Sequence, residues 1–250
     1  MFLLKEKMRA AAAAVLLAGL IVFCWQISLR LRNVIESGRE TSGNVSEEGS
    51  LVMIDPGHGG ADPGKIGVNE AEEKDINLEI ALKIQNILSE EDISVMMTRS
   101  TDERLADSQV EDLRARVDMI NKNHPVLTVS IHQNSYSDGA VRGAQVFYFE
   151  SSKEGEAAAG YIQNALGELD PENAKQIKAN NTYYLLKNTE VPVVIAECGF
   201  LSNYEEAEML IAEEYQTQVA EAVAAGVLQY LQAESRSAVL CELQPRLTEL

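Results

Sequence analysis

The feature that most constrains the fold is a short apolar run that ends abruptly in a glycine-rich turn. Leu51–Ile54 is apolar at every position, and Asp55 and Pro56 break it just before His58, which stands among glycines. Strands without a polar position are buried on both faces and are typical of parallel sheets covered by helices. This stretch therefore predicts one strand of an α/β sheet, with a polar loop at its carboxyl end.

A second apolar run ends in the same way. Residues 126–131 lead directly into His132, and the chain has only 3 histidines. The third, His124, precedes Pro125 and is expected at the surface. A single histidine in a glycine turn is most often structural. Neutral imidazole is also the commonest metal ligand in proteins, and two histidines at the ends of predicted strands favour a metal site.

The remaining elements follow from apolar spacing, which alternates between the periods of strands and helices. Ser202 and Asn203 stand three residues before Glu205 and Glu206, the spacing of a capping box, and predict the start of a further helix. The other predicted helices are 73–88, 110–122, 155–169 and 213–232, and the predicted strands are 51–54, 94–98, 126–131, 144–149, 183–186 and 193–196. We therefore expect a single α/β domain with a mostly parallel twisted sheet flanked by helices on both faces.

The N-terminal region predicts export. A basic flank precedes an apolar run over residues 10–25. This run is short of the ~20 residues that span a bilayer, but it suits the apolar region of an export signal. Residues 1–32 are interpreted as a signal peptide or a membrane anchor, so membrane association through this segment is one expectation. A flexible linker over 33–50, a catalytic domain over 51–232 and a C-terminal tail over 233–250 complete the predicted organisation.

Charge and cysteine usage exclude two classes of function. The formal net charge is -18, and from residue 33 onward 16 basic residues stand against 38 acidic ones, a net charge of -22. So acidic a domain repels phosphate backbones, which argues against nucleic-acid binding. The 3 cysteines, Cys24, Cys198 and Cys241, show no paired spacing. They predict neither a disulfide scaffold nor a cysteine zinc site.

A third metal ligand and a catalytic acid are available. A catalytic zinc usually has three protein ligands, which leaves one position free for water. The acidic stretch 70–75 offers the third, with Glu73 preferred for its place at the start of a helix, although composition does not separate it from Glu72. Glu197 follows the apolar strand 193–196, where ligands of α/β sheets gather. The alternative that Glu197 only caps the next turn stays open. Cys198 should point to the opposite side and be buried.

Four ordered blocks, Asp55–Gly60, Glu73–Asp75, Ser130–Asn134 and Glu197–Asn203, resemble the signature blocks of zinc-dependent N-acetylmuramoyl-L-alanine amidases, the amidase_3 family. The resemblance covers about residues 51 to 231. It implies one Zn²⁺ held by the metal ligands His58, Glu73 and His132, with Glu197 as the catalytic residue. Thr98, Arg99 and residues 116–121 match lesser positions, interpreted as structural. Gln133 stands where many members carry alanine, which implies a change in local pocket shape.

The resemblance also implies a reaction and a setting. The reaction is hydrolysis of the amide between the lactyl group of N-acetylmuramic acid and the L-alanine of the stem peptide, with peptidoglycan muropeptides as substrates. A short N-terminal segment and one compact domain are most similar to the germination-specific, spore-cortex members. Those members imply a step towards muramic-δ-lactam with a peptidoglycan deacetylase acting next, an accessory spore protein, and a location in the forespore–cortex space.

Three alternatives remain at this point. A vegetative cell-wall autolysin would use the same chemistry on a different wall. A zinc peptidase would use the same ligands on peptides that carry no glycan. A silent wall-binding module would bind muropeptides and leave them intact, although Glu197 beside a complete ligand set speaks against silence.

Overall fold

The computed structural model describes residues 50–247. The predicted signal or anchor over 1–32 and almost all of the linker over 33–50 lie outside the described residues. Among residues 50–247, no helix is both long and apolar enough to cross a membrane.

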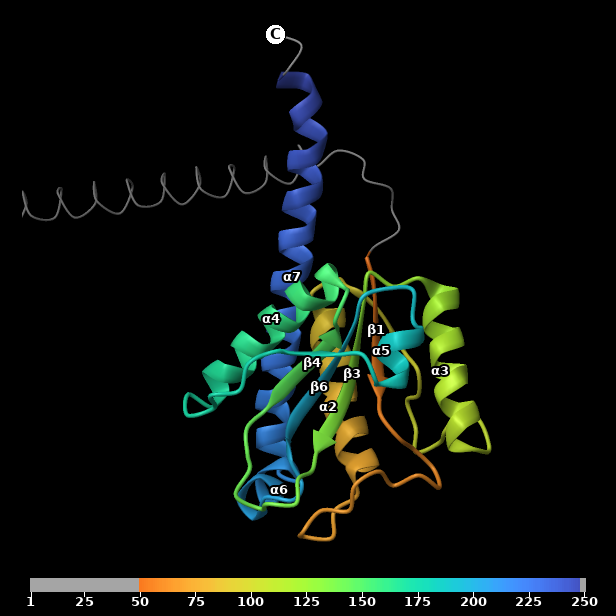
Figure 1. The fold of residues 1–250 in the computed structure, drawn as a ribbon, viewed down its shortest axis with the longest axis vertical. Helices are drawn as coiled ribbons and strands as arrows, with labels where there is room; N and C mark the ends of the chain where they lie inside the picture. Colours follow the sequence, from red (N-terminus) through yellow and green to blue (C-terminus); the bar gives the residue numbers. More distant parts are fainter. Residues whose placement is uncertain (1–49, 248–250) are drawn as a thin grey trace, which may run out of the picture. The chain divides into compact units, whose positions relative to one another are not determined.

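The centre of the domain is a six-stranded sheet, shown in Figure 1. Its strands are β1 (Leu51–Pro56), β2 (Ser94–Met97), β3 (Leu127–Asn134), β4 (Gln145–Phe149), β5 (Lys178–Asn180) and β6 (Val193–Phe200). They lie in the order β2-β1-β3-β6-β4-β5. Every neighbouring pair is parallel except β4 with β6, which is antiparallel. The prediction of a mostly parallel sheet is confirmed.

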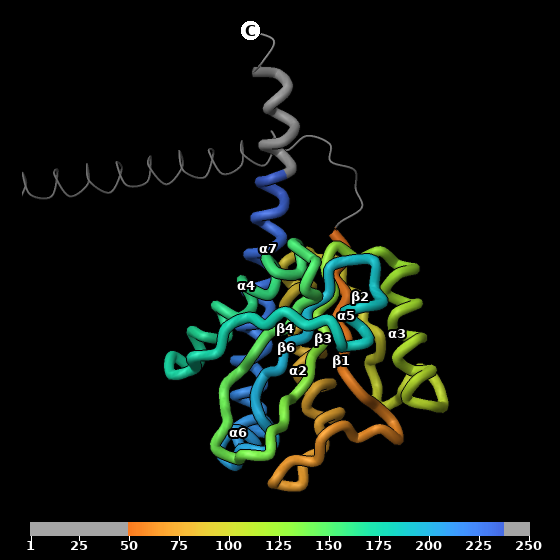
Figure 2. The backbone as a smooth tube through the Cα atoms, in the orientation of Figure 1, coloured from red at the N-terminus to blue at the C-terminus, as the bar shows by residue number. Residues whose placement is uncertain are grey.

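Helices cover both faces of the sheet, as predicted (Figures 1 and 2). One face is covered by α2 (Glu73–Glu90), α4 (Lys153–Leu169), α6 (Tyr204–Leu210) and α7 (Glu213–Leu247). Their apolar side chains and those of the strands form the main core, in which Ile80, Ile84 and Ile162 are fully buried. The opposite face carries α3 (Gln109–Asn123) and the short helix α5 (Tyr184–Asn188) over a smaller apolar cluster.

Two predictions about secondary structure were wrong. Residues 183–186 were predicted as a strand, but Tyr183 is the N-cap of the helix α5 and residues 184–186 are its first turn; the edge strand β5 lies just before them. Periodicity does not separate strand from helix in a four-residue apolar run. Leu185 and Leu186 are buried in the smaller cluster instead. The last helix continues to Leu247 rather than ending at Gln232, because no glycine or proline interrupts residues 227–244.

The predicted cap of α6 is present in a different form. The side chain of Asn203 accepts a hydrogen bond from the backbone N–H of Glu206 at 3.0 Å. The Glu206 carboxylate does not complete the reciprocal bond of a capping box. It accepts instead from the backbone N–H groups of Phe200 and Gly143, at 2.8 and 3.0 Å. Glu206 thus ties α6 to the loops at the end of the sheet.

Sheet register brings the predicted site residues together. In the neighbouring strands β1 and β3, Pro56 pairs with Ile131, so the turn that carries His58 begins beside His132. In β3 and β6, His132 pairs directly with Glu197. All three residues therefore lie at the carboxyl ends of adjacent parallel strands, the usual position of ligand sites in such sheets.

Candidate active site

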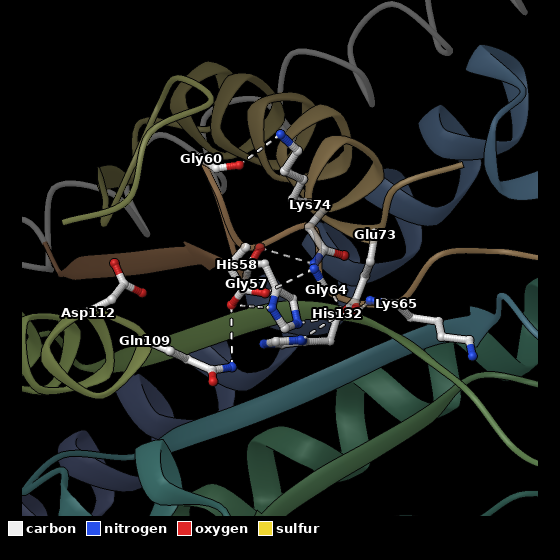
Figure 3. A network of polar contacts seen from close by, with 12 residues as sticks. Gly57, His58, Gly60, Gly64, Lys65, Glu73, Lys74, Gln109, Asp112 and His132 are labelled. Carbon is white, nitrogen blue, oxygen red and sulfur yellow. Dashed lines mark hydrogen bonds and ion pairs between the residues drawn. The ribbon is translucent and has the colours of Figure 1, made fainter. Parts of the chain in front are cut away.

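Two histidines and a glutamate form a cluster of potential metal ligands (Figure 3). The nitrogen and oxygen atoms that His58, Glu73 and His132 can offer lie within 4.8 Å of one another. His58 Nε2 is 3.3 Å from Glu73 Oε2, and His132 Nδ1 is 2.9 Å from Glu73 Oε1. Zinc bonds of ~2.1 Å in a tetrahedron place neighbouring ligand atoms roughly 3.4 Å apart. The donor set and its size therefore fit a mononuclear metal site.

The backbone around the cluster leaves no room for larger residues. A Cβ atom on Gly57 would overlap the imidazole ring of His132. A Cβ on Gly64 would lie 2.6 Å from Glu73 Oε2, and Gly64 also has a φ of +67°. Glycine is the residue that tolerates such a close approach and such a backbone conformation. These two glycines let both ligand side chains pack directly against the main chain.

His58 itself adopts the left-handed conformation, with a φ of 63°. Two buried arginines donate hydrogen bonds to the carbonyls of this turn. Arg116 donates to the carbonyls of Pro56 and His58, at 2.7 and 2.6 Å. Arg99 donates to those of Pro56 and Gly57, at 3.1 and 3.0 Å. A non-glycine residue with positive φ persists only where its surroundings hold it, and the two guanidinium groups supply that restraint.

A buried charged network lies beneath the turn. Asp55 accepts hydrogen bonds of 2.6 Å from Thr98, Ser130 and Arg116. Arg116 also pairs with Asp112 at 2.7 Å. Burial raises the pKa of Asp55, but Arg116 and the two hydroxyl hydrogen bonds outweigh it and hold the pKa below its usual value. The positions interpreted as structural from the sequence therefore support the His58 turn.

Glu73 is held in place by several donors. Its Oε1 accepts hydrogen bonds from Asn77 and from the backbone N–H of Gln133, at 3.3 and 3.1 Å. Its Oε2 accepts from the backbone N–H of Lys65 at 2.8 Å. Burial raises the pKa of Glu73, but the two neighbouring histidines outweigh it and lower the pKa well below its usual range. Glu73 therefore stays ionised, as a metal ligand requires.

His58 has a second carboxylate partner that the sequence did not single out. Its Nδ1 lies 3.0 Å from Asp62 Oδ2. Burial lowers the pKa of His58, but Glu73 and then Asp62 outweigh it and raise the pKa to about 9. A carboxylate behind a ligating histidine fixes its ring orientation and tautomer. The only sequence signal for Asp62 was its position four residues after His58 in the same polar loop.

Glu197 lies beside the cluster and faces the same cavity as His58 and His132. It is 9% exposed, and no partner among the described residues bonds its buried Oε2. Burial raises the pKa of Glu197 to about 7, with a further increase from Glu73 and opposition from the histidines. A carboxyl group with this pKa exchanges a proton readily near neutral pH. The alternative that Glu197 only caps the next turn does not fit the structure. In that turn the backbone N–H of Phe200 donates to Glu206 instead.

The cavity is about 420 Å³ in volume, a size suited to part of an extended substrate. One wall is polar and contains the residues described above. The other wall comes from α3, α5 and the segment before α5, and it consists of Gln109, Leu113, Tyr183, Tyr184 and Leu185.

Three other residues lie outside the cavity. His124 is exposed and caps the C-terminus of α3, in agreement with the prediction. Cys198 is buried in the core on the opposite face from Glu197, also as predicted. Gln133 does not line the cavity, and its effect on local pocket shape stays a prediction. Its side chain points towards α2 and donates to Asn77 at 3.2 Å.

Comparison with known proteins identifies the family. Residues 52–229 match the N-acetylmuramoyl-L-alanine amidase family, Amidase_3. The chain belongs to this family. It is 37% identical over 190 residues to the germination-specific N-acetylmuramoyl-L-alanine amidase of Bacillus subtilis (strain 168), covering 73% of this chain and 80% of that protein. The predicted family and enzyme class are confirmed: the chain is a metal-dependent N-acetylmuramoyl-L-alanine amidase that acts on peptidoglycan.

Two solved amidases share the fold. The CwlD amidase from Clostridioides difficile, in complex with the GerS lipoprotein, superposes with a TM-score of 0.71 at 33% identity, over 74% of this chain and 99% of that one. The catalytic domain of CwlV, an amidase from Bacillus (Paenibacillus) polymyxa var. colistinus, gives 0.66 at 31% identity, over 73% and 98%. Both alignments cover nearly the whole of the solved chain.

Proposed function

We propose that His58, Glu73 and His132 hold one zinc ion and that Glu197 is the catalytic acid–base of the amidase. The observation that carries the proposal is the position of Glu197. Its Oε2, which has no hydrogen-bond partner among residues 50–247, is buried, and Glu197 shares one cavity with the two histidines of the cluster. Two histidines and one carboxylate are a usual ligand set of a catalytic zinc. When bound, zinc supplies Lewis acidity towards an amide carbonyl and an attacking water.

The chain's own residues would move the proton. Glu197 in its carboxylate form accepts a proton from the attacking water as the water oxygen bonds to the lactyl carbonyl carbon. The same carboxyl group then donates that proton to the nitrogen of L-alanine as the carbon–nitrogen bond breaks. Burial raises the pKa of Glu197, and the positive charge of a bound zinc would lower it again, so the carboxyl group both accepts and releases a proton without a large cost. The products are a free lactyl carboxylate and a stem peptide with a free amino terminus.

The biological setting is proposed from the relatives. The similar B. subtilis enzyme is named as germination-specific. We propose that this protein cleaves spore-cortex peptidoglycan. The cleavage would be one step towards muramic-δ-lactam, and a peptidoglycan deacetylase would act next. An accessory protein is expected, since the similar C. difficile amidase was solved with the GerS lipoprotein. Action on the cortex requires export of the protein to the forespore–cortex space. We propose that the N-terminal segment directs this export, either as a cleaved signal peptide or as a membrane anchor.

The test is product analysis on defined muropeptides. The zinc-loaded full-length protein is compared with Glu197→Gln, and products are read by mass spectrometry. We expect release of a stem peptide that begins at L-alanine, and a loss of turnover of about 10³-fold in the variant. Zinc content, measured by atomic absorption, should remain at one ion per chain in both proteins. A variant that retains turnover would remove Glu197 from the proposed role, and a variant without zinc would place it among the ligands.

A further inference from the structure

Two lysines outside the cavity have no role in the reaction described above, and one of them, Lys175, lines a separate hollow with Arg142 and Asn173. Lys175 Nζ lies 5.0 Å from the centroid of the Phe200 ring, and Lys178 Nζ lies 5.7 Å from that of Phe147. These are the two cation–aromatic contacts in the part of the chain that the structure describes. Among residues 50–247, neither ammonium group has a carboxylate within 4.0 Å. Ring faces orient the two charges without neutralising them.

Sheet register places Lys178 on the same face as the catalytic glutamate. In β4 and β6, Gln145 pairs with Glu197 and Phe147 pairs with Ile195. In β4 and β5, Phe147 pairs with Lys178. Residues in register share a face of the sheet, and neighbouring strands are ~4.8 Å apart. Lys178 therefore lies about 10 Å to the side of the row of β6 residues, Ile195 and Glu197, that lines the cavity.

A bulge turns Phe200, and with it Lys175, to this face as well. The register of β3 and β6 shifts between His132 and Asn134. Cys198 is buried in the core under α6 and α7, and a Cβ on Gly199 would also face that core, 3.1 Å from Leu210. Two successive residues on one side are the mark of a β-bulge. The next residue, Phe200, therefore points to the side of Glu197, and Lys175 stands beyond the end of β6.

The backbone that carries the lysines is fixed against the site. Gln145, the neighbour of Glu197, donates its side-chain amide to the carbonyl of Gln176 at 2.8 Å. The ring of Tyr183 packs on Phe147 with centroids 5.4 Å apart, and Tyr183 also lines the cavity. These contacts fix the backbone of the segment that carries the lysines relative to β4, whose residue Gln145 pairs with Glu197.

We propose that Lys175 and Lys178 form a subsite that binds a free carboxylate of the stem peptide. The inference rests on the proposed function, because it requires the peptide to leave the scissile amide across β4 and β5. An extended peptide advances ~3.4 Å per residue. The distance of about 10 Å is measured from the β6 row of Ile195 and Glu197, so a carboxylate bound at Lys178 would be at least about three residues from the bond that is cut. The protein has a net charge of -18, so an anionic peptide needs local cations to approach it.

The test measures binding, so that it does not depend on turnover. Muropeptides with free carboxylates on the peptide, and the same muropeptides with those groups amidated, are titrated into Glu197→Gln protein by calorimetry. Each lysine is changed to methionine alone and together in that background. Lys153→Met, an exposed lysine at the start of α4, is the matched control. Lys178→Arg retains a cation that stacks on a ring and should restore binding.

We expect the free-carboxylate muropeptide to bind about 3-fold more weakly to each single variant and about 10-fold more weakly to the double variant. The loss should shrink as salt is raised. Amidation should abolish the difference between the double variant and its parent. Equal losses on both muropeptides, or no loss on either, would overturn the subsite. The same binding pattern in zinc-loaded protein with Glu197 unchanged, if that protein left the amide intact, would support the subsite and count against the proposed function.

Discussion

The two faces of the sheet differ in what fills them. The face under α2, α4, α6 and α7 is a continuous apolar core that includes Ile80, Ile84 and Ile162. The face under α3 and α5 has a smaller apolar cluster, the buried network of Asp55, Arg116 and Asp112, and the cavity. Strand alternation sends successive residues of β1, β3 and β6 to opposite faces. The face under α2, α4, α6 and α7 therefore stabilises the domain through burial of apolar side chains. The face under α3 and α5 has a smaller apolar area because part of it forms the polar site.

The largest effect is expected from Arg116→Met, which removes the cation of the polar face. It leaves Asp55 and Asp112 buried without their partner and releases the carbonyl of His58. Breaking a buried pair in this way costs about 3–5 kcal/mol of unfolding free energy. Urea unfolding measures that loss, and zinc titration should show weaker binding by the protein that still folds. Arg114→Met, an exposed arginine on the same helix, is the control, and an equal effect of both changes would contradict the argument.

Ile162→Ala tests the apolar face. This side chain of α4 is fully buried in the main core, and its truncation should cost about 3 kcal/mol through lost burial and a cavity. Zinc affinity and turnover should stay at wild-type values, because the change lies across the sheet from the site. Ile162→Val should cost only about 1 kcal/mol. A change in zinc affinity that follows the stability loss would show that the two faces are not independent.

Acid should destabilise the polar face specifically. The pKa of Asp55 is held below its unfolded value of 3.8. Its contribution to stability is therefore complete above that value and is lost as the pH falls through and below about 4. Urea midpoints from pH 7 to pH 3 should fall less in Asp55→Asn than in wild type, while Ile162→Ala keeps the wild-type slope. The loss is smaller than for Arg116→Met, since protonated Asp55 still accepts from Thr98 and Ser130. Identical slopes of urea midpoint against pH in all three proteins would show that Asp55 is not the source of the acid sensitivity.

The smallest effect concerns the helix caps on the two faces. Asn203→Ala removes the cap of α6 and should cost about 1 kcal/mol. Ser108→Ala removes the cap of α3, whose bond is longer at 3.3 Å and exposed, and should cost about 0.5 kcal/mol. Thermal unfolding compares the two. Asn203 belongs to a signature block of the family, so a loss of zinc binding in its variant would assign it a role beyond capping.

Much of the fold was predictable because its signals are local. Continuous apolar strands such as 51–54 and 193–196 predicted a buried parallel sheet, and helical spacing located α2, α3, α4 and the start of α7. The failures lie where local signals are weak. A four-residue run at 183–186 has no decisive period, and β5 is only three residues long. Burial of Leu185 and Leu186 against the sheet, which is a tertiary interaction, decided that α5 is a helix.

By itself the sequence determined the residues of the candidate site, because His58, His132 and Glu197 each stand where an apolar strand gives way to a polar turn. Composition left Glu72 and Glu73 unresolved, and the family resemblance favoured Glu73.

Only the tertiary structure showed how these residues are held. The supports of the site, Asp62, Asn77, Arg99 and Arg116, come from separate segments and act through hydrogen bonds to side chains and backbone carbonyls. Such contacts depend on which segments lie close together in three dimensions. The spacing of residues along one segment does not predict that proximity. The same holds for Lys175 and Lys178, whose place on the face of the sheet that carries Glu197 follows from strand register and a bulge.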